Sequence, residues 1–235
     1  MESLLITGAN GFLGSHLAQF FQKNNTKIYG ISHGNPINSN VEQIHDDILS
    51  VKTLPTKISN ILHFAALTDI QFCENNPDRC FEINVNGTKN MLELARKNDS
   101  RFIFASSSHV YGKPDSLPID ENSSLKPISI HAKSKVQAES ICEEYAKLYG
   151  LRISIVRTFS IYGQYSPSYS IISRIINQIL SQEKIILGNI NARRDFLHVS
   201  DFLSAIDILN KNNNGGCLKF NIGYGQGISI KELCM

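Results

Sequence analysis

The sequence lacks any apolar run long enough to cross a membrane. Its most apolar stretch, residues 171–180, is interrupted by serine, arginine, asparagine and glutamine, whereas a membrane-spanning helix needs about 20 predominantly apolar residues. The N-terminus also lacks the basic segment, apolar segment and small-residue cleavage site of a secretory signal peptide. These absences predict a cytoplasmic protein that has no membrane partner.

Cysteine and charge form no pattern that would mark a metal centre or a nucleic-acid surface. The five cysteines are odd in number and include no C-x-x-C pair, which argues against a disulfide framework and against zinc. No pair of histidines has a convincing metal-binding spacing. The 23 basic and 21 acidic residues are scattered and give a net charge of +2, so we expect neither a metal site nor a nucleic-acid partner.

What the chain does contain is an alternation of short β-rich runs and longer amphipathic stretches. The 235 residues, 42% of them hydrophobic, are enough for one domain, or one domain with a small appendage. Strands are predicted at residues 3–7, 27–31, 43–48, 60–65, 101–106, 152–157, 184–187 and 219–222. This order is typical of an α/β fold of the Rossmann type, a doubly wound parallel sheet with helices on both faces.

Helices are predicted between these strands from the spacing of apolar residues. Residues 13–21, 81–95 and 171–180 each form one apolar stripe, which we expect the sheet to cover. Ser200 and Asp201 are candidate caps for a helix that continues to about Leu209. Residues 229–233, close to the last residue of the sequence, resemble the first turn of a further helix.

A glycine-rich turn directly follows the first predicted strand and opens the first helix. In the run Gly8-Ala9-Asn10-Gly11-Phe12-Leu13-Gly14, the glycines satisfy three needs: a tight turn, close approach of backbone to a pyrophosphate, and contact between helix and strand. The helix N-terminus would supply N–H groups and a positive dipole to the phosphates. The turn therefore predicts a dinucleotide site, although the same glycines would also suit a strand-to-helix corner without a ligand.

The residues after the second and third predicted strands bear on which dinucleotide binds. No acidic residue ends the second strand, and Ser32 and His33 stand where an NAD-preferring protein carries an acid for the ribose hydroxyls. This favours NADP over NAD. Asp47, with Ile48 beside it at the end of the predicted third strand, is either a partner for the adenine amino group or a solvated surface acid.

Seven motifs in order resemble the extended short-chain dehydrogenase/reductase family, in its group of nucleotide-sugar epimerases, dehydratases and reductases. They are Thr7-Gly8-x-x-Gly11-x-x-Gly14, His63-Phe64-Ala65-Ala66, Asn84-Val85-x-Gly87-Thr88, Ser106-Ser107-Ser108-His109-Val110-Tyr111-Gly112, Ser134-Lys135, Arg157-x-x-x-Ile161-Tyr162-Gly163 and Arg194-Asp195-Phe196-x-His198-Val199-x-Asp201. The resemblance covers nearly the whole chain. It implies an NAD(P)-dependent enzyme acting on a nucleotide sugar.

The resemblance also implies individual roles. Ala65 and Ala66 would run beside the cofactor, or serve only tight packing, and Asn84 would brace the neighbouring strand and loop. Ser107 would hydrogen-bond the reacting sugar oxygen with Ser108 beside it, and Lys135 would grip the nicotinamide ribose. Arg194 would reach the substrate diphosphate, unless it is part of a surface basic pair. His109 stands where sugar 4,6-dehydratases of this family carry a glutamate, which disfavours that reaction.

The family tyrosine that serves as general acid/base is missing. Its place, one helical turn before Lys135 and on the same face, is taken by His131, and no tyrosine lies between Tyr111 and Tyr145. Three interpretations stay open. A neutral His131 imidazole replaces the phenol as proton carrier, other groups carry the chemistry while His131 lines the pocket, or the site only binds ligands.

The chain is also shorter than the usual family member. We expect residues 1–165 to form the dinucleotide-binding domain and 166–235 to form a shortened substrate-binding part, with 199–222 returning to the Rossmann core. The predicted function is an NAD(P)-dependent nucleotide-sugar epimerase or reductase/dehydrogenase, and the alternative is a catalytically silent dinucleotide-binding protein. The resemblance also implies a homodimer in which each subunit contributes two helices, and the apolar stripes at 81–95 and 138–145 permit such a dimer or burial within the monomer.

Overall fold

The computed structural model describes residues 3–22, 26–32, 41–181, 184–212 and 215–235. At its centre lies a seven-stranded sheet in which every strand is parallel to its neighbours. The strands run in the order β3 (Glu42–Ile44), β2 (Lys27–Ile31), β1 (Ser3–Thr7), β4 (Asn60–His63), β5 (Arg101–Ser107), β6 (Ile153–Thr158) and β9 (Cys217–Ile222). The order reverses between β1 and β4, so a ligand is expected beyond the carboxyl ends of these two strands.

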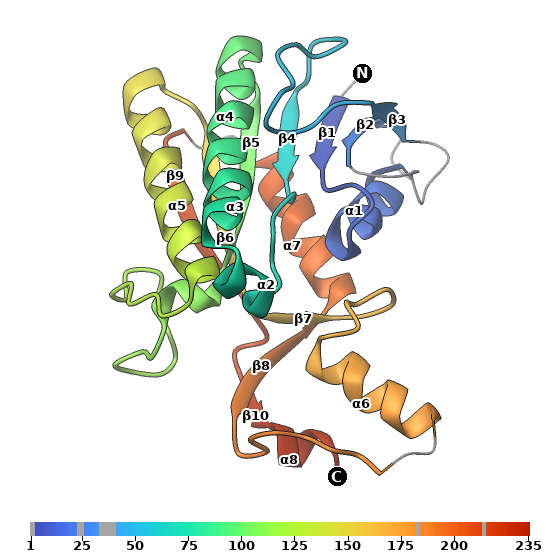
Figure 1. The fold of residues 1–235 in the computed structure, drawn as a ribbon. Helices are drawn as coiled ribbons and strands as arrows, with labels where there is room; N and C mark the ends of the chain where they lie inside the picture. Colours follow the sequence, from blue (N-terminus) through green and yellow to red (C-terminus); the bar gives the residue numbers. More distant parts are fainter. Residues whose placement is uncertain (1–2, 23–25, 33–40, 182–183, 213–214) are drawn as a thin grey trace.

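Helices cover both faces of this sheet, which confirms the predicted fold class (Figure 1). On one face, α4 (Gly87–Asn98) and α5 (Ile130–Tyr149) bury residues such as Leu92 and Cys142 against Phe102 and Ile155. On the other face, α1 (Phe12–Gln22) and α7 (Val199–Lys211) pack against alternate residues of the same strands. Because both faces are covered, the strands are apolar on both sides, as in other doubly wound sheets.

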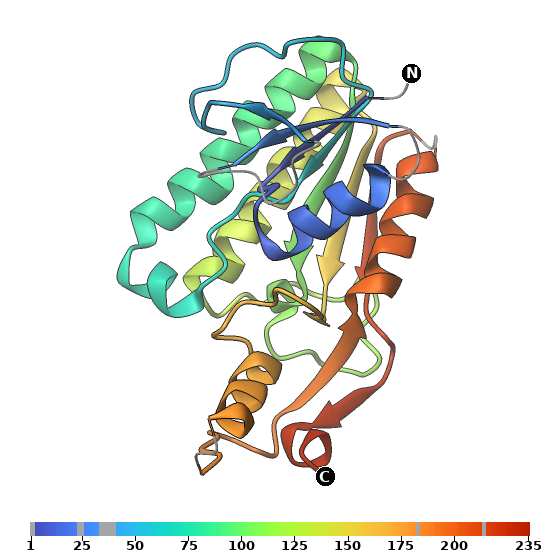
Figure 2. The same cartoon turned by 90° about the vertical axis from the view of Figure 1, so that its right-hand side faces the viewer.

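A second, smaller group of elements lies beyond the carboxyl ends of the large sheet (Figure 2). Its sheet has the order β10 (Gly227–Ser229), β8 (Arg193–His198) and β7 (Ser160–Tyr162), and it is accompanied by α6 (Ile171–Leu180) and α8 (Ile230–Leu233). Between β8 and β10 the chain returns to the large sheet through α7 and β9. The division into two domains at residue 165 stays a prediction; β7 precedes that boundary yet pairs with β8.

Three predicted elements differ from those observed. Residues 184–187 form no strand, and the strand predicted at 43–48 is β3, which ends at Ile44 and leaves Asp47 in a loop. Helix α7 begins at Val199, before the predicted caps, because the His198 ring Nδ1 accepts the Ser200 backbone N–H and takes the capping role. Short strands and caps depend on a few local hydrogen bonds, which hydrophobic periodicity does not reveal.

The sequence also predicted that the sheet would cover the apolar stripe of α6, and this prediction is wrong. The large sheet does not cover its apolar stripe: only Ile175 is buried, and Ile176, Ile179 and Leu180 are 49%, 55% and 75% exposed. The reason is position, since α6 lies beside the small sheet and beyond the edge of the large one (Figure 1). Within the described part of the chain, no helix combines the length and apolarity needed to cross a bilayer.

Candidate active site

The glycine-rich turn has the geometry that its sequence predicted. Gly8 adopts φ +71°, donates its N–H to the Ile31 carbonyl of β2 and accepts from the Gly11 N–H at 2.8 Å. A Cβ on Gly8 would lie 2.9 Å from the Ala65 nitrogen, and one on Gly14 would lie 2.1 Å from the Gly8 oxygen. Only glycine fits at both places, so the turn brings the N-terminus of α1 against the end of β4.

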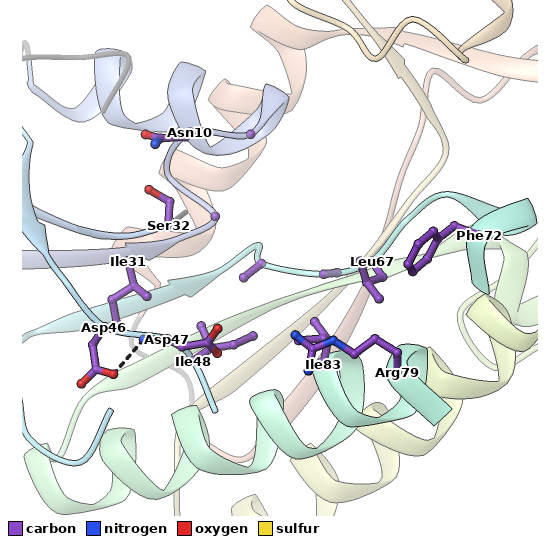
Figure 3. A pocket seen from close by; sticks show the side chains of 14 residues that line it. Asn10, Ile31, Ser32, Asp46, Asp47, Ile48, Leu67, Phe72, Arg79 and Ile83 are labelled. Carbon is purple, nitrogen blue, oxygen red and sulfur yellow. Dashed lines mark hydrogen bonds between the residues drawn. The ribbon is translucent and has the colours of Figure 1, made fainter. Parts of the chain in front are cut away.

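A cavity of about 500 Å³ extends from this turn along the carboxyl edge of the large sheet (Figure 3). Its wall carries eight of the predicted cofactor residues, namely Gly8, Asn10, Gly11, Ser32, Asp47, Ile48, Ala65 and Ala66. Four of the other predicted residues are not on this wall. Gly14 packs against the turn, and Phe12 and Leu13 begin α1. Lys135 lies on α5, and its ammonium group reaches the Ala105 carbonyl near the end of β5. His33 lies outside the described residues.

Four further wall residues were not predicted from the sequence. Asp46 comes from the loop after β3, Phe72 from α2 (Ile70–Asn75), Arg79 from α3 (Pro77–Phe81) and Ile83 from the following π-helical turn, η1 (Glu82–Asn86). Helices of five or six residues are too short to show a period. Nothing in their pattern could therefore have assigned these side chains to the cavity.

A buried hydrogen-bond chain fixes the backbone of Ala65 beside the cavity. The Thr7 hydroxyl accepts the N–H groups of Phe64 and Ala65 and lies 2.7 Å from His63 Nδ1. The Thr88 hydroxyl donates to the Asn84 carbonyl, so it is placed to accept from His63 Nε2 at 3.0 Å. This pattern assigns a proton to Nε2 only, and burial lowers the pKa of His63 to about 3, with the Lys135 charge adding to the shift.

Asn84 performs the bracing role that the resemblance implies. Its carboxamide accepts the Leu67 N–H at 2.8 Å and donates to the Leu67 carbonyl at 3.0 Å. The same amide nitrogen donates to Ser134 Oγ, which donates to the His131 carbonyl. Asn84 thus joins the cavity wall at Leu67 to the first turn of α5, where the predicted catalytic residues begin.

The three predicted catalytic residues meet where β5 ends and α5 begins. Ser107 ends β5, while His131 and Lys135 lie one turn apart on α5, which Ser129 caps. Lys135 is 3% exposed, donates to the Ala105 carbonyl at 2.7 Å and lies 4.8 Å from the centre of the Phe104 ring. Burial lowers the pKa of Lys135 to about 8.

His131 is 5% exposed, and neither of its ring nitrogens has a hydrogen-bond partner. Burial, together with the smaller effects of the Lys135 and His109 charges, lowers the pKa of His131 to about 3, so the ring is neutral at physiological pH. The His109 ring stands perpendicular to it at 6.1 Å between centres. Buried imidazole nitrogens without partners are costly, which is typical of groups whose partner is a ligand.

Two of the predicted substrate residues, Ser107 and Arg194, act on His109. Ser107 and Ser108 are half-buried, and Ser107 Oγ accepts the His109 N–H at 3.2 Å, which leaves its hydroxyl proton available to a ligand. Arg194 is exposed on β8, and its charge lowers the pKa of His109 after the larger effect of burial. The neighbouring Arg193 differs, because it forms an ion pair with Glu232 at 3.2 Å.

A buried ion pair behind the site explains two motifs whose role the sequence did not define. Arg157 Nη2 on β6 lies 2.7 Å from Glu139 Oε2 on α5, and the two side chains are 1% and 3% exposed. Glu139 also accepts from Ser106, and Arg157 donates to the Tyr111 hydroxyl at 2.8 Å. The pair therefore joins β5, β6 and α5 directly beneath Ser107 and Lys135.

Known proteins are similar to this chain in sequence and in fold. The model of the NAD dependent epimerase/dehydratase family matches residues 4–223. A putative UDP-glucose 4-epimerase of Methanocaldococcus jannaschii is 36% identical over 98% of this chain and 79% of its own length, and GDP-6-deoxy-D-mannose reductase of Pseudomonas aeruginosa is 30% identical over 99% and 78%. A solved variant of UDP-glucuronic acid 4-epimerase from Bacillus cereus, in complex with UDP-4-deoxy-4-fluoro-glucuronic acid and NAD, is 28% identical, has a TM-score of 0.89, and is matched over 98% of this chain and 80% of its own. By sequence and by fold, this chain belongs to the NAD dependent epimerase/dehydratase family of enzymes.

Proposed function

We propose that this protein is an NAD-dependent epimerase or reductase/dehydrogenase of a nucleotide sugar. The observation that carries the proposal is the shared edge of the sheet: the cavity behind the Gly8–Gly11 turn and the Ser107, His131 and Lys135 cluster both lie at the carboxyl ends of its strands. The glycine turn fits a dinucleotide, because Gly8 and Gly11 line the cavity and the turn brings the N–H groups and positive dipole of the α1 N-terminus to it.

The cavity favours NAD over the NADP that the sequence suggested. Ser32 already receives hydrogen bonds from the Gln43 amide, at its carbonyl and its hydroxyl. Asp46 and Asp47 line the same end of the cavity, and hydrogen bonds from Ser50 and the Asp47 N–H lower the pKa of the Asp46 carboxyl. A 2′-phosphate placed there would be repelled by these carboxylates.

The site residues then have distinct tasks. Bound NAD supplies the hydride acceptor for a carbon of the sugar. Ser107 donates its hydroxyl proton to the reacting sugar oxygen, and the neutral His131 accepts the proton that the sugar hydroxyl loses. Lys135, held by the Ala105 carbonyl, would hold the nicotinamide ribose, as the resemblance implies.

Arg194 and Ser108 bind the substrate in this proposal. A guanidinium suits the two-oxygen geometry of a diphosphate, and the exposed Arg194 stands on β8 within electrostatic reach of His109. Relatives named as acting on UDP-linked and GDP-linked sugars support a nucleoside diphosphate sugar as the substrate class.

A homodimer is also proposed, on the resemblance alone. The stripe residues that suggested it, such as Leu92 and Cys142, are buried within the monomer. Sedimentation of the purified protein measures the oligomeric state directly.

Incubation of the purified protein with NAD⁺ and a panel of UDP-, GDP- and dTDP-linked sugars tests the proposed reaction. We expect turnover of at least one sugar, followed by nicotinamide absorbance for a net oxidation and by NMR of the sugar for epimerisation. The Ser107→Ala variant should bind NAD⁺ as the wild type does but turn over at least about tenfold more slowly, since it loses one donor to the reacting oxygen. Tight NAD⁺ binding without turnover of any sugar would instead support the silent binding protein.

A further inference from the structure

Arg79 is the only positively charged side chain among the described residues that line the cavity. It extends from α3 into the cavity toward Ile83, on the side opposite Asp46 and Asp47 (Figure 3). The cavity therefore has an acidic end and a basic end. A ligand with a concentrated negative charge would be repelled by the first and attracted by the second.

The backbone of α3 that carries Arg79 is held firmly by the next residue, Cys80. Cys80 is fully buried, with Sγ 3.7 Å from Ser134 Oγ and 3.5 Å from Asn84 Nδ2. The Asn84 carboxamide also holds both backbone groups of Leu67, another residue of the cavity wall. Helix α3 and the cavity wall are thus one hydrogen-bonded unit, and the position of Arg79 relative to the cavity is fixed.

The Arg79 guanidinium takes part in one weak, solvent-exposed ion pair. Its partner is Glu82, 2.6 Å away and three residues later, and the two side chains are 49% and 46% exposed. Exposed pairs of this kind contribute little to stability because water screens the two charges, so a charged ligand can replace Glu82 at little cost. A dinucleotide brings two negative charges, and the α1 N-terminus offers only partial positive charge to them.

We propose that Arg79 binds the diphosphate of the nicotinamide dinucleotide and exchanges Glu82 for it when the cofactor enters. This inference rests on the proposed function, since it needs NAD to occupy the cavity. Glu82 then acts as a competitor for the guanidinium, and the dinucleotide is oriented with its diphosphate toward α3 and its adenosine toward Asp46 and Asp47.

Calorimetric titration of the wild type and of Arg79→Gln with NAD⁺, NADP⁺, ADP and adenosine tests the inference. We expect Arg79→Gln to bind NAD⁺ and ADP about tenfold more weakly, the loss expected for one charge-assisted hydrogen bond, and adenosine unchanged. Glu82→Gln should bind NAD⁺ more tightly than the wild type does, because the guanidinium loses its competitor.

Arg96→Gln is the matched control. Arg96 and Glu93 form the same kind of exposed pair, three residues apart, on α4, but Arg96 does not line the cavity. It should therefore leave NAD⁺ affinity unchanged, and the unfolding temperatures of both variants should stay close to that of the wild type.

A failure of this inference can be distinguished from a failure of the proposed function. A wild type that binds no NAD⁺ would refute the proposed function. A wild type that binds NAD⁺ while Arg79→Gln binds it equally well would overturn only the role of Arg79. A loss that is as large for adenosine as for ADP, or that appears only with NADP⁺, would also overturn it, because the contact would then be to the base or to a 2′-phosphate.

Discussion

His131 is a neutral, buried imidazole at the place where the resemblance implies a tyrosine. The two groups differ in the form that accepts a proton. An imidazole accepts while neutral, and burial ensures this state by lowering the pKa of His131 to about 3. A phenol must first ionise, which requires a nearby cation such as the Lys135 ammonium.

Two variants at this position separate the interpretations. His131→Phe removes the acceptor and should lower kcat by about a hundredfold or more, within the usual range for general acid/base catalysis. His131→Tyr should retain turnover, but its kcat should fall as the pH drops through neutrality, because the phenol becomes protonated. Wild-type kcat should show no such fall from His131 between about pH 5 and 7, since its pKa lies well below that window.

The measurement is kcat against pH for the three proteins, with NAD⁺ affinity as a check on folding. Wild-type turnover in His131→Phe would show that other groups carry the proton. If both variants bind NAD⁺ and only the wild type turns over, the imidazole itself is required.

Among the elements, β5, β6 and α5 are held together behind the site by the buried ion pair of Arg157 and Glu139. Burial alone would lower the pKa of Arg157, yet contacts with Glu139 and Tyr111 outweigh it and raise that pKa, so the guanidinium remains charged. Removing one partner leaves the other charge buried without compensation, which costs about 3–5 kcal/mol.

Glu139→Gln should therefore lower the free energy of unfolding by about 3–5 kcal/mol, measured by urea denaturation. Glu93→Gln, which breaks the more exposed pair with Arg96, is the control and should cost no more than about 1 kcal/mol. Equal, small losses in both variants would contradict the role of the Glu139–Arg157 pair as the support of this site.

The elements also show what the sequence can and cannot predict. Five strands and the turn at Gly8 were predicted nearly to the residue, because buried parallel strands are long apolar runs and the turn requires glycine. The stripe of α6 predicted a helix correctly but not its surroundings, since periodicity shows that a face is apolar without showing what covers it. Arg79, Asp46 and the orphaned nitrogens of His131 depend on contacts between distant segments, which a single sequence does not contain.

On the scale of the whole molecule, two buried histidines near the site make the stability of the fold depend on pH. His63 joins β1, β4 and α4 by hydrogen bonds, and the His131 ring on α5 stands against His109 in the turn that follows β5. Both have a folded pKa of about 3, against 6.5 for an unperturbed imidazole. Between these two values the unfolded chain binds protons that the folded chain does not.

The free energy of unfolding should therefore be highest above about pH 6.5 and fall as the pH decreases toward 3, by up to about 1.4 kcal/mol per pH unit for each histidine. Urea denaturation at a series of pH values gives this slope. His63→Gln should reduce the slope by the share of one histidine, whatever its effect on stability at neutral pH. An unchanged slope in His63→Gln would mean that the imidazole gains a proton without unfolding, and that the Thr7–His63–Thr88 chain is not what holds Ala65 against the cavity.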